Sequence, residues 1–294
     1  MTTIDHTIAE SAKFDLAGAP FSVGTVTLRV RDLDQVTGFY RRALGLDLLY
    51  SGNDSARLGA DGRTLLELRA EPGILPRDPT AAGLFHTAFL LPSRGDLARW
   101  LVHAREAGLR LDGASDHVVS EAIYLSDPEG NGIEIYADRP PGDWNTDGTG
   151  IAMRTDPLDI ADLLSATDGR TWTGAPAGTV IGHVHLQVGD TASADQFYRD
   201  ILGFEVMARY PGASFFGSGG YHHQLAGNVW NSPGAGHRDE SRAGLAGLAL
   251  EARDRELVAA VKARATGAGV AVEGDDTRLL LRDPWGTPIV IRPR

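Results

Sequence analysis

Histidine and glutamate side chains occupy several strand-like positions of this 294-residue sequence where they could bind a metal ion. His183 and His185 alternate with apolar residues, so on a β-strand both imidazoles lie on one face. Glu134 stands between two isoleucines, and a carboxylate on an inward-facing strand needs a partner, for which a cation is suited. The alternative is that Glu134 is a solvated glutamate at a sheet edge.

His86 is a third candidate ligand, because it occupies in its own predicted strand the position that His183 occupies in another. The set His86, His183 and Glu134 has two imidazoles and one carboxylate and leaves coordination positions open, which is typical of non-haem Fe(II) sites. The sequence contains no cysteine, so any metal ion must be held by His, Asp or Glu. His185 remains an alternative to His183, since either imidazole could reach a cavity.

An internal repeat indicates which elements must position these side chains. The matched segments are GTVTLRV at 24–30 with GHVHLQV at 182–188, Phe39-Tyr40 with Phe197-Tyr198, Leu44-Gly45 with Leu202-Gly203, Ala82-Gly83-Leu84 with Ala243-Gly244-Leu245, and Asp127-Pro128 with Asp283-Pro284. Each repeated unit combines an alternating strand, a capped amphipathic helix ended by glycine, and further strand-like segments. This pattern predicts four βαβββ modules, two in each half of the chain.

The fold class predicted from these modules is α+β. The four modules are expected at 22–72, 83–138, 180–231 and 243–293. A tail over 1–21 precedes them, and the segment 139–179 matches no module. This segment opens with Pro-Pro-Gly, which is typical of a linker, and it contains a predicted short helix over Leu158–Ser165.

With their Phe-Tyr and Leu-Gly pairs, the four modules resemble the vicinal oxygen chelate superfamily, which includes glyoxalases, fosfomycin-resistance proteins and extradiol dioxygenases. The resemblance covers nearly the whole chain. It implies two cupped mixed sheets, in which two modules close around one metal ion with ligands from their first and last strands. It also favours His183 over His185 as the ligand, because His183 occupies the position that holds the metal in that superfamily.

Within the superfamily, the sequence resembles extradiol dioxygenases of the catechol 2,3-dioxygenase type. The resemblance implies that His86, His183 and Glu134 hold Fe(II), which Mn(II) could replace. It brings together seven positions in modules two and three, and three of them are these ligands. The other four, His117, Tyr124, His222 and His223, are side chains expected around the substrate.

The resemblance also implies roles for the side chains around the metal. His223 is the expected acid–base residue, and His117 and Tyr124 are expected to hydrogen-bond the substrate oxygen and assist its deprotonation. His222 is expected to contact the substrate, and so is His185, which lies outside the seven positions and shares a strand face with His183. Tyr124 stands ten residues before Glu134, as the family pattern requires.

The order of the modules departs from that of the best-known two-domain extradiol enzymes, where the module with His and Glu ligands comes last. Here that module is the second, and the module that carries His183 is the third. Modules two and three must therefore pair to share one metal site, within a chain or between chains. Module four has Gly247 and Val290 at the ligand positions, so modules one and four are expected to form a metal-free body.

The expected function is Fe(II)-dependent cleavage of a catechol by O2 beside its hydroxyl groups, which yields a muconic semialdehyde. One alternative is a non-redox metal enzyme of the glyoxalase or glutathione-transfer sort. Pairing of modules one and two would give it His86, Glu134 and Glu67 as ligands. The other alternative is a metal-free small-molecule binding protein. The retention of ligand residues in two modules argues against it.

Composition argues against several other classes of function. The chain has 39 acidic and 28 basic residues, and its net charge of −11 would repel nucleic acids and anionic membranes. No apolar run approaches the roughly 18 residues of a membrane span, and the N-terminal residues lack a secretion signal. We expect a soluble, cytoplasmic protein, with formation of a homo-oligomer left open.

Overall fold

The computed structural model describes residues 16, 18–145 and 150–294. Most of the tail predicted over 1–21 lies outside the described residues, as do residues 146–149 of the predicted linker. The described chain contains four βαβββ modules, each with a first strand, a helical segment and three further strands.

The first two modules have regular α-helices. Module one consists of β1 (Phe21–Val30), α1 (Leu33–Leu44), β2 (Asp47–Ser51), β3 (Ser55–Ala60) and β4 (Arg63–Ala70). Module two consists of β5 (Gly83–Leu90), α2 (Arg94–Glu106), β6 (Gly113–Asp116), β7 (Ser120–Ser126) and β8 (Gly132–Asp138).

In the third module, a short α-helix continues as a π-helix. Module three consists of β10 (Val180–Gln187), α4 (Thr191–Asp195), the π-helix η2 (Gln196–Leu202), β11 (Glu205–Tyr210), β12 (Ala213–Gly217) and β13 (Leu225–Asn228). Module four consists of β14 (Gly244–Ala252), α5 (Arg255–Gly267), β15 (Val272–Gly274), β16 (Leu279–Arg282) and β17 (Pro288–Pro293).

Helix ends lie where the sequence supplies capping residues. The Asp32 carboxylate accepts a hydrogen bond from the backbone N–H of Gln35 and begins α1. Ser93 begins α2 in the same way, by accepting from the backbone N–H of Asp96. Gly45 ends α1 with a φ of 67°, a left-handed conformation that glycine adopts without steric cost. The caps therefore set where each helix returns the chain to the sheet.

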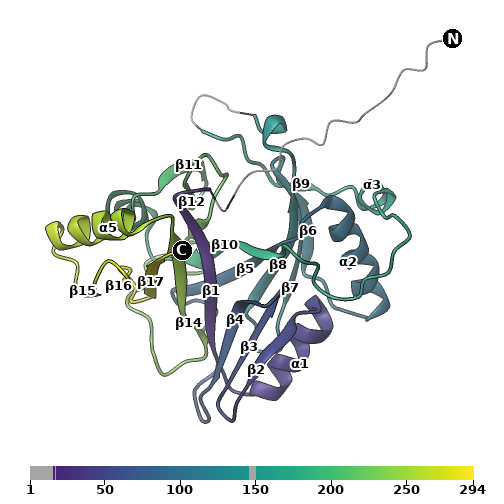
Figure 1. Ribbon diagram of the computed structural model, residues 1–294, viewed down its shortest axis with the longest axis horizontal. Coiled ribbons are helices and arrows are strands. Elements are labelled where there is room, and N and C mark those ends of the chain that lie inside the picture. Colours follow the sequence, from purple (N-terminus) through teal and green to yellow (C-terminus); the bar gives the residue numbers. More distant parts are fainter. Residues whose placement is uncertain (1–15, 17, 146–149) are drawn as a thin grey trace.

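The modules pair into two mixed sheets, module one with module four and module two with module three (Figure 1). The strand orders are β15-β16-β17-β14-β1-β4-β3-β2 and β11-β12-β13-β10-β5-β8-β7-β6-β9. Antiparallel pairing of β1 with β14, and of β5 with β10, joins the two modules of each sheet. Helices α1, α2 and α5 lie at the outside of the molecule in Figure 1. The expected α+β fold of two cupped mixed sheets is confirmed.

Two tyrosine–aspartate hydrogen bonds explain the repeated Phe-Tyr and Asp-Pro motifs. The Tyr40 hydroxyl of α1 donates to Asp127 at 3.5 Å, and the Tyr198 hydroxyl of η2 donates to Asp283 at 2.9 Å. Both carboxylates are buried and also accept backbone N–H groups of the turns that they begin. Each hydrogen bond links a module of one sheet to a module of the other, so the repeated motifs hold the sheets together.

Apolar side chains from both sheets form one continuous core. Trp100 of α2 is fully buried, and its indole N–H donates to the carbonyl of Ala43 in α1 at 2.9 Å. Phe21 of β1 stacks on Phe204 of module three, with ring centroids 4.8 Å apart. The core therefore joins the two halves of the chain into one body.

Three short elements lie in the segment between modules two and three. They are the 3-10 helix η1 (Pro141–Asp143), the strand β9 (Asp156–Pro157) and the helix α3 (Ile160–Ser165). Strand β9 extends the nine-stranded sheet beside β6, and α3 lies within the predicted helix. The Arg94 guanidinium ties this segment to the sheet by ion pairs with Asp162 at 2.6 Å and Glu121 at 2.5 Å.

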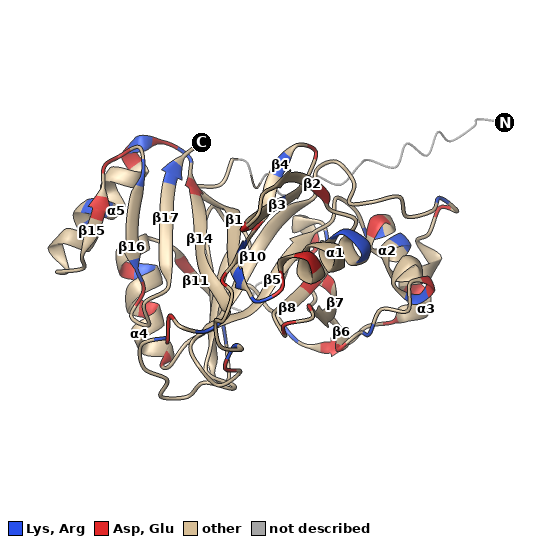
Figure 2. Cartoon of the chain, turned by 90° about the horizontal axis from the view of Figure 1, so that it is seen from below, with Lys and Arg blue, Asp and Glu red and all other residues tan. Residues whose placement is uncertain are grey.

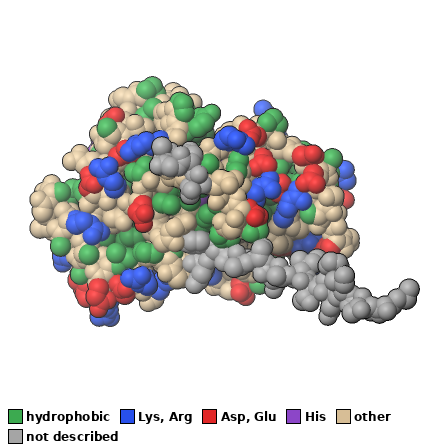
Figure 3. All heavy atoms as spheres, turned by 90° about the horizontal axis from the view of Figure 1, so that it is seen from above, with side chains coloured by type: hydrophobic (Ala, Val, Ile, Leu, Met, Phe, Trp, Pro, Cys, Tyr) green, Lys and Arg blue, Asp and Glu red, His purple; other side chains and the backbone are tan. Residues whose placement is uncertain are grey.

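Charged side chains of both signs are distributed over both sheets and the helices (Figure 2). On the face drawn in Figure 3, acidic and basic side chains are interspersed with apolar ones. Within the described part of the chain, no helix has the length and apolar character needed to cross a membrane.

Candidate metal centre and active site

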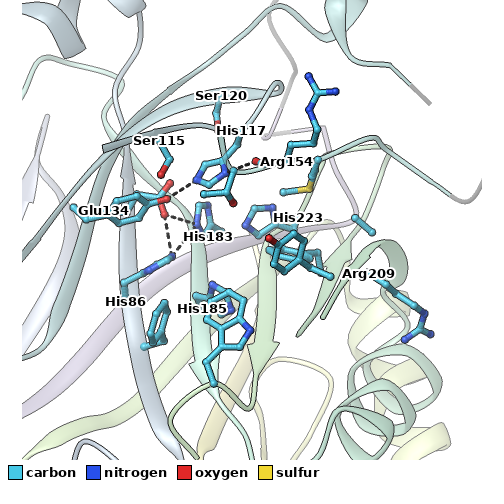
Figure 4. Close-up of a pocket in the computed structure, with 18 residues that line it drawn as sticks. His86, Ser115, His117, Ser120, Glu134, Arg154, His183, His185, Arg209 and His223 are labelled. Carbon is cyan, nitrogen blue, oxygen red and sulfur yellow. Dashed lines mark hydrogen bonds and ion pairs between the residues drawn. The ribbon is translucent and has the colours of Figure 1, made fainter. Parts of the chain in front are cut away.

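A cavity of about 250 Å³ is lined by residues of modules two and three and of the segment between them. Five of the nine histidines in the chain line this cavity, which concentrates the imidazoles in one place. The predicted site residues on its wall are His86, His117, Tyr124, Glu134, His183, His185 and His223. Figure 4 shows these side chains, apart from the unlabelled Tyr124, around one space, whereas those of Arg154 and Arg209 extend away from it.

His86, Glu134 and His183 lie close enough together to hold one ion (Figure 4). The Nε2 atoms of His86 and His183 lie 3.0 and 3.3 Å from the same Glu134 oxygen. The two nitrogens lie 3.3 Å from each other, and all three side chains are buried. Among the described residues, no other three His, Cys, Asp or Glu side chains converge in this way.

Strand register explains this convergence. Ala88 of β5 pairs with Glu134 of β8 on one side and with His183 of β10 on the other. His86 lies two residues before Ala88 on β5, so its side chain shares the same face of the sheet. The small side chain of Ala88 lies between the three ligands and leaves room for them.

The protonation states of this cluster fit a divalent metal ion. Burial lowers the pKa of His183 to about 4, although the nearby Glu134 acts in the opposite direction. Burial acts to raise the pKa of Glu134, but the adjacent imidazoles of His183 and His86 outweigh this effect and lower it well below its usual value. A neutral imidazole and an ionised carboxylate are the forms that bind metals, so these residues can hold an ion at neutral pH.

His185 lines the same cavity but is not part of the three-ligand cluster. Its ring centroid lies 5.0 Å from that of His86 and 5.4 Å from that of Trp230. Burial lowers the pKa of His185 well below its usual value, so the ring is neutral. The geometry therefore places His185 on the cavity wall, where a substrate could touch it.

Substitution of the two alternating histidines should separate ligand from wall residue. We expect His183→Ala to abolish metal retention, because it removes a ligand from the cluster, whereas His185→Ala should retain the metal and much of the activity. Metal content per chain after gel filtration, measured on both variants, checks this prediction. Loss of metal from His185→Ala alone would show that the wrong histidine had been assigned.

Tyr124 and His117 form a hydrogen-bonded pair beside the cluster. The distance from the Tyr124 hydroxyl to His117 Nε2 is 2.5 Å, and His117 Nδ1 lies 2.8 Å from the carbonyl oxygen of Arg154. Since a carbonyl only accepts, His117 carries its proton on Nδ1 and accepts the Tyr124 proton on Nε2. Burial, together with the charge of Glu134, raises the pKa of Tyr124 well above its usual value, so its hydroxyl remains a donor.

His223 lies on the other side of the cluster, in the segment between β12 and β13. Its ring centroid is 4.1 Å from that of His183, and the ring lines the cavity without joining the ligand set. Burial, reinforced by His183 and the other nearby imidazoles, lowers the pKa of His223 well below its usual value. A neutral imidazole in this place can accept a proton from a substrate.

His222 does not line the cavity, contrary to the expectation that it contacts the substrate. It is fully buried, with Nδ1 2.8 Å from Nδ1 of His223 and Nε2 2.9 Å from the carboxylate of Asp138. Both ring nitrogens are therefore already engaged within the protein. An imidazole has no third polar atom to offer a substrate.

The apolar wall of the cavity was not predicted from the sequence. It is formed by Phe85, Phe215, Trp230 and Tyr210. The ring centroids of Phe85 and Trp230 lie 5.4 Å apart in an edge-to-face arrangement, and Phe215 lies 5.7 Å from His185. This wall gives the cavity an aromatic side that adjoins its histidines, with Phe85 5.3 Å from His86 and Phe215 5.0 Å from His223 between ring centroids.

A β-bulge explains why the alternation of residues along β5 did not reveal that Phe85 lines the cavity. Adjacent residues of a regular strand point to opposite faces, so Phe85 and His86 should not share a cavity. In β5, however, His86 pairs with His185 while Leu84 pairs with Leu186, which leaves Phe85 as an extra residue. The bulge turns Phe85 to the same side as His86.

Comparison with known proteins gives the following similarities. A family model described as the glyoxalase/bleomycin resistance protein/dioxygenase superfamily matches residues 22–135 and 180–291. The chain is 38% identical over 268 residues to the catechol-2,3-dioxygenase of Bacillus subtilis (strain 168), which covers 89% of this chain and 93% of that protein. It is 31% identical to biphenyl-2,3-diol 1,2-dioxygenase 3 of Rhodococcus globerulus, over 38% of this chain and 60% of that protein.

Solved structures share the fold at low sequence identity. Glyoxalase I from Zea mays aligns with a TM-score of 0.57 and 16% identity, over 93% of this chain and 92% of that chain. The cppA protein from Streptococcus pneumoniae TIGR4 aligns with a TM-score of 0.55 and 13% identity, over 93% and 99% of the two chains. At these identities the likeness shows a shared fold alone.

Proposed function

We propose, from the premise that the chain belongs to the glyoxalase/bleomycin resistance protein/dioxygenase superfamily, that it is an Fe(II)-dependent enzyme that cleaves a catechol ring. The resemblance to this superfamily and to catechol 2,3-dioxygenases is confirmed, and the similarity over 89% of the chain makes it an oxidoreductase of the extradiol dioxygenase class. The parts that we propose are the metal, the substrate and the product.

One observation carries the proposal. A buried cluster of two imidazoles and a carboxylate lies on the wall of a cavity that also presents His223 and Tyr124. When bound there, Fe(II) would supply adjacent coordination positions for a catechol and O2 and a path for electrons between them. Two neutral imidazoles and one carboxylate leave a net charge of +1 on such an ion, which a singly ionised catechol neutralises.

The protein side chains bind the substrate and move its protons. His223 accepts a proton from a catechol hydroxyl, which its neutral imidazole can do near neutral pH. The Tyr124 hydroxyl donates its proton to His117, so its oxygen can accept a hydrogen bond from a substrate hydroxyl next to Glu134. The aromatic wall covers the ring of the substrate and keeps water from it.

The proposed product is a muconic semialdehyde, formed by cleavage beside the two hydroxyl groups. Fe(II) is the proposed metal because the open two-histidine, one-carboxylate set suits this chemistry, and Mn(II) is a second ion that such a set accepts. The cavity of about 250 Å³ has room for a small aromatic diol.

A glyoxalase-like site with Glu67 as a ligand is not favoured by the structure. Glu67 lies on β4 in the eight-stranded sheet, whereas His86 and Glu134 lie in the nine-stranded sheet. The Glu67 carboxylate pairs with Arg69 at 2.9 Å. A metal-free binding protein is not favoured either, because the three potential ligands His86, Glu134 and His183 converge on the wall of the cavity.

The experiment that tests the proposal is anaerobic loading with Fe(II), followed by exposure to air and a panel of catechols. We expect a yellow ring-cleavage product, with one O2 consumed for each catechol. Loading with Mn(II) in parallel identifies the metal that supports turnover. Inactivity with every catechol and with both metals would refute the proposed function.

A further inference from the structure

A chain of hydrogen bonds leads from His223 to a carboxylate at the end of β8. His223 Nδ1 lies 2.8 Å from His222 Nδ1, and His222 Nε2 lies 2.9 Å from Oδ1 of Asp138. His222 is fully buried and His223 is 5% exposed, so the contact between the two rings is shielded from water, whereas Asp138 is partly buried. This Asp138–His222–His223 relay ends at the cavity, where Figure 4 shows the His223 ring facing the metal cluster.

The partners along the relay determine which nitrogen of each ring carries a proton. An ionised carboxylate can only accept, so His222 donates its Nε2 proton to Asp138. With one proton on the ring, at Nε2, the Nδ1 atom of His222 accepts the Nδ1 proton of His223. His223 is left with an unprotonated Nε2, the nitrogen that the relay does not use.

The Asp138 carboxylate is held in place from its other side. The Tyr221 hydroxyl donates to Oδ2 of Asp138 at 2.9 Å, and the Tyr136 hydroxyl lies 2.8 Å from that of Tyr221. Burial, and then the charge of Asp138, raise the pKa of Tyr221 well above the usual value, so its hydroxyl stays protonated and donates to Asp138. Oδ1 therefore remains available to His222 as an acceptor.

We propose that His222 and Asp138 are positioning residues that hold His223 in the tautomer whose Nε2 accepts a proton from the bound catechol. This inference rests on the proposed function, because it concerns the acid–base step of ring cleavage. In that step a substrate O–H bond breaks and an N–H bond forms at His223 Nε2. The His223 Nδ1 proton stays in the hydrogen bond to His222, through which Asp138 stabilises the imidazolium.

The relay also connects the two modules that form the cavity. Asp138 and Glu134 lie four residues apart on β8, so their side chains share one face of that strand. His223 belongs to module three, whereas β8 belongs to module two. The strand that provides the carboxylate ligand therefore also orients the acid–base residue of the other module.

Asp138→Asn tests the relay most sharply, because the amide keeps the size of the carboxylate and replaces one oxygen with an N–H donor. With the Tyr221 hydroxyl donating to the amide oxygen, the amide N–H group faces His222 and reverses both tautomers. His223 then carries its proton on Nε2 and cannot accept another from the substrate. Nitrogen-15 spectra of histidine-labelled, metal-free protein should show His223 change from the Nδ1–H to the Nε2–H tautomer.

Kinetics of the Fe(II)-loaded variants provide the second measurement. We expect Asp138→Asn to lower kcat by roughly 10²–10⁴-fold, with KM and iron content close to wild type. His222→Gln keeps an oxygen that accepts the His223 Nδ1 proton, whereas His222→Phe removes every acceptor. His222→Gln should therefore turn over about tenfold faster than His222→Phe, a rescue that a purely structural role would not produce.

The control is Asp168→Asn, which alters an aspartate that pairs with Arg99 and Arg170 away from the relay. It should match wild type in both tautomer and kcat. An unchanged His223 tautomer with unchanged kcat in Asp138→Asn would overturn the relay. If the wild-type protein cleaves no catechol, the proposed function fails, and the tautomer measurement on metal-free protein still supports or overturns the relay by itself.

Discussion

Replacement of His223 by phenylalanine is expected to slow turnover by roughly 10²–10⁴-fold, the usual contribution of a positioned proton-transfer group. Iron content and catechol binding should remain nearly unchanged, because the ligand set is complete without His223. Phenylalanine keeps the bulk of a ring that packs 4.1 Å from His183 and 5.0 Å from Phe215, measured between centroids. Packing losses should therefore be small beside the loss of the two nitrogens.

Iron per chain and single-turnover kinetics, measured on the same sample of His223→Phe, decide this prediction. Parallel loss of iron and activity would show that His223 is a metal ligand. Wild-type turnover would remove it from the proton transfer altogether.

Glu134→Gln is expected to remove stoichiometric metal binding and with it all ring-cleaving activity. The amide keeps the volume of the side chain but lacks the charge that balances the metal ion. A bound ion stabilises the folded state by about 2.7 kcal/mol at a free concentration about 100 times its Kd. Thermal unfolding should therefore show a metal-dependent rise in Tm for the wild type and none for Glu134→Gln.

Glu67→Gln is the matched control for this substitution. Glu67 pairs with Thr27 in module one as Glu134 pairs with Ala88 in module two, so both occupy the same position in their modules. We expect Glu67→Gln to keep the metal-dependent rise in Tm and the activity. A loss of metal from Glu67→Gln, with retention in Glu134→Gln, would instead support the glyoxalase-like alternative.

Much of the fold could be predicted from the repeats, because the repeated residues make equivalent contacts in the two halves of the molecule. Tyr40 and Tyr198 recur because each donates a hydrogen bond to a buried aspartate across the two sheets. The candidate ligands His86 and His183 lie in different halves of the sequence, and they meet because β5 is the neighbour of β10. Alternation along β8 and β10 placed Glu134 and His183 on inward faces, where the structure has them.

Features that depend on irregular backbone could not be predicted. Phe85 faces the cavity because of a bulge in β5. The alternation of residues along a strand does not reveal where a bulge occurs. His222 lies behind His223 because Asp138, which is distant along the chain, engages its Nε2 atom. The adjacent pair of histidines by itself did not indicate which ring faces the substrate.

The proposed reaction inserts both atoms of O2 into a catechol beside its hydroxyl groups. The most direct measurement is mass spectrometry of the product formed by Fe(II)-loaded protein under oxygen-18 gas, with the aldehyde reduced at once to prevent exchange with water. We expect a ring-opened semialdehyde with one labelled oxygen in its carboxylate and one in its aldehyde. A muconate cleaved between the hydroxyl groups, or an unlabelled quinone, would contradict the proposed reaction.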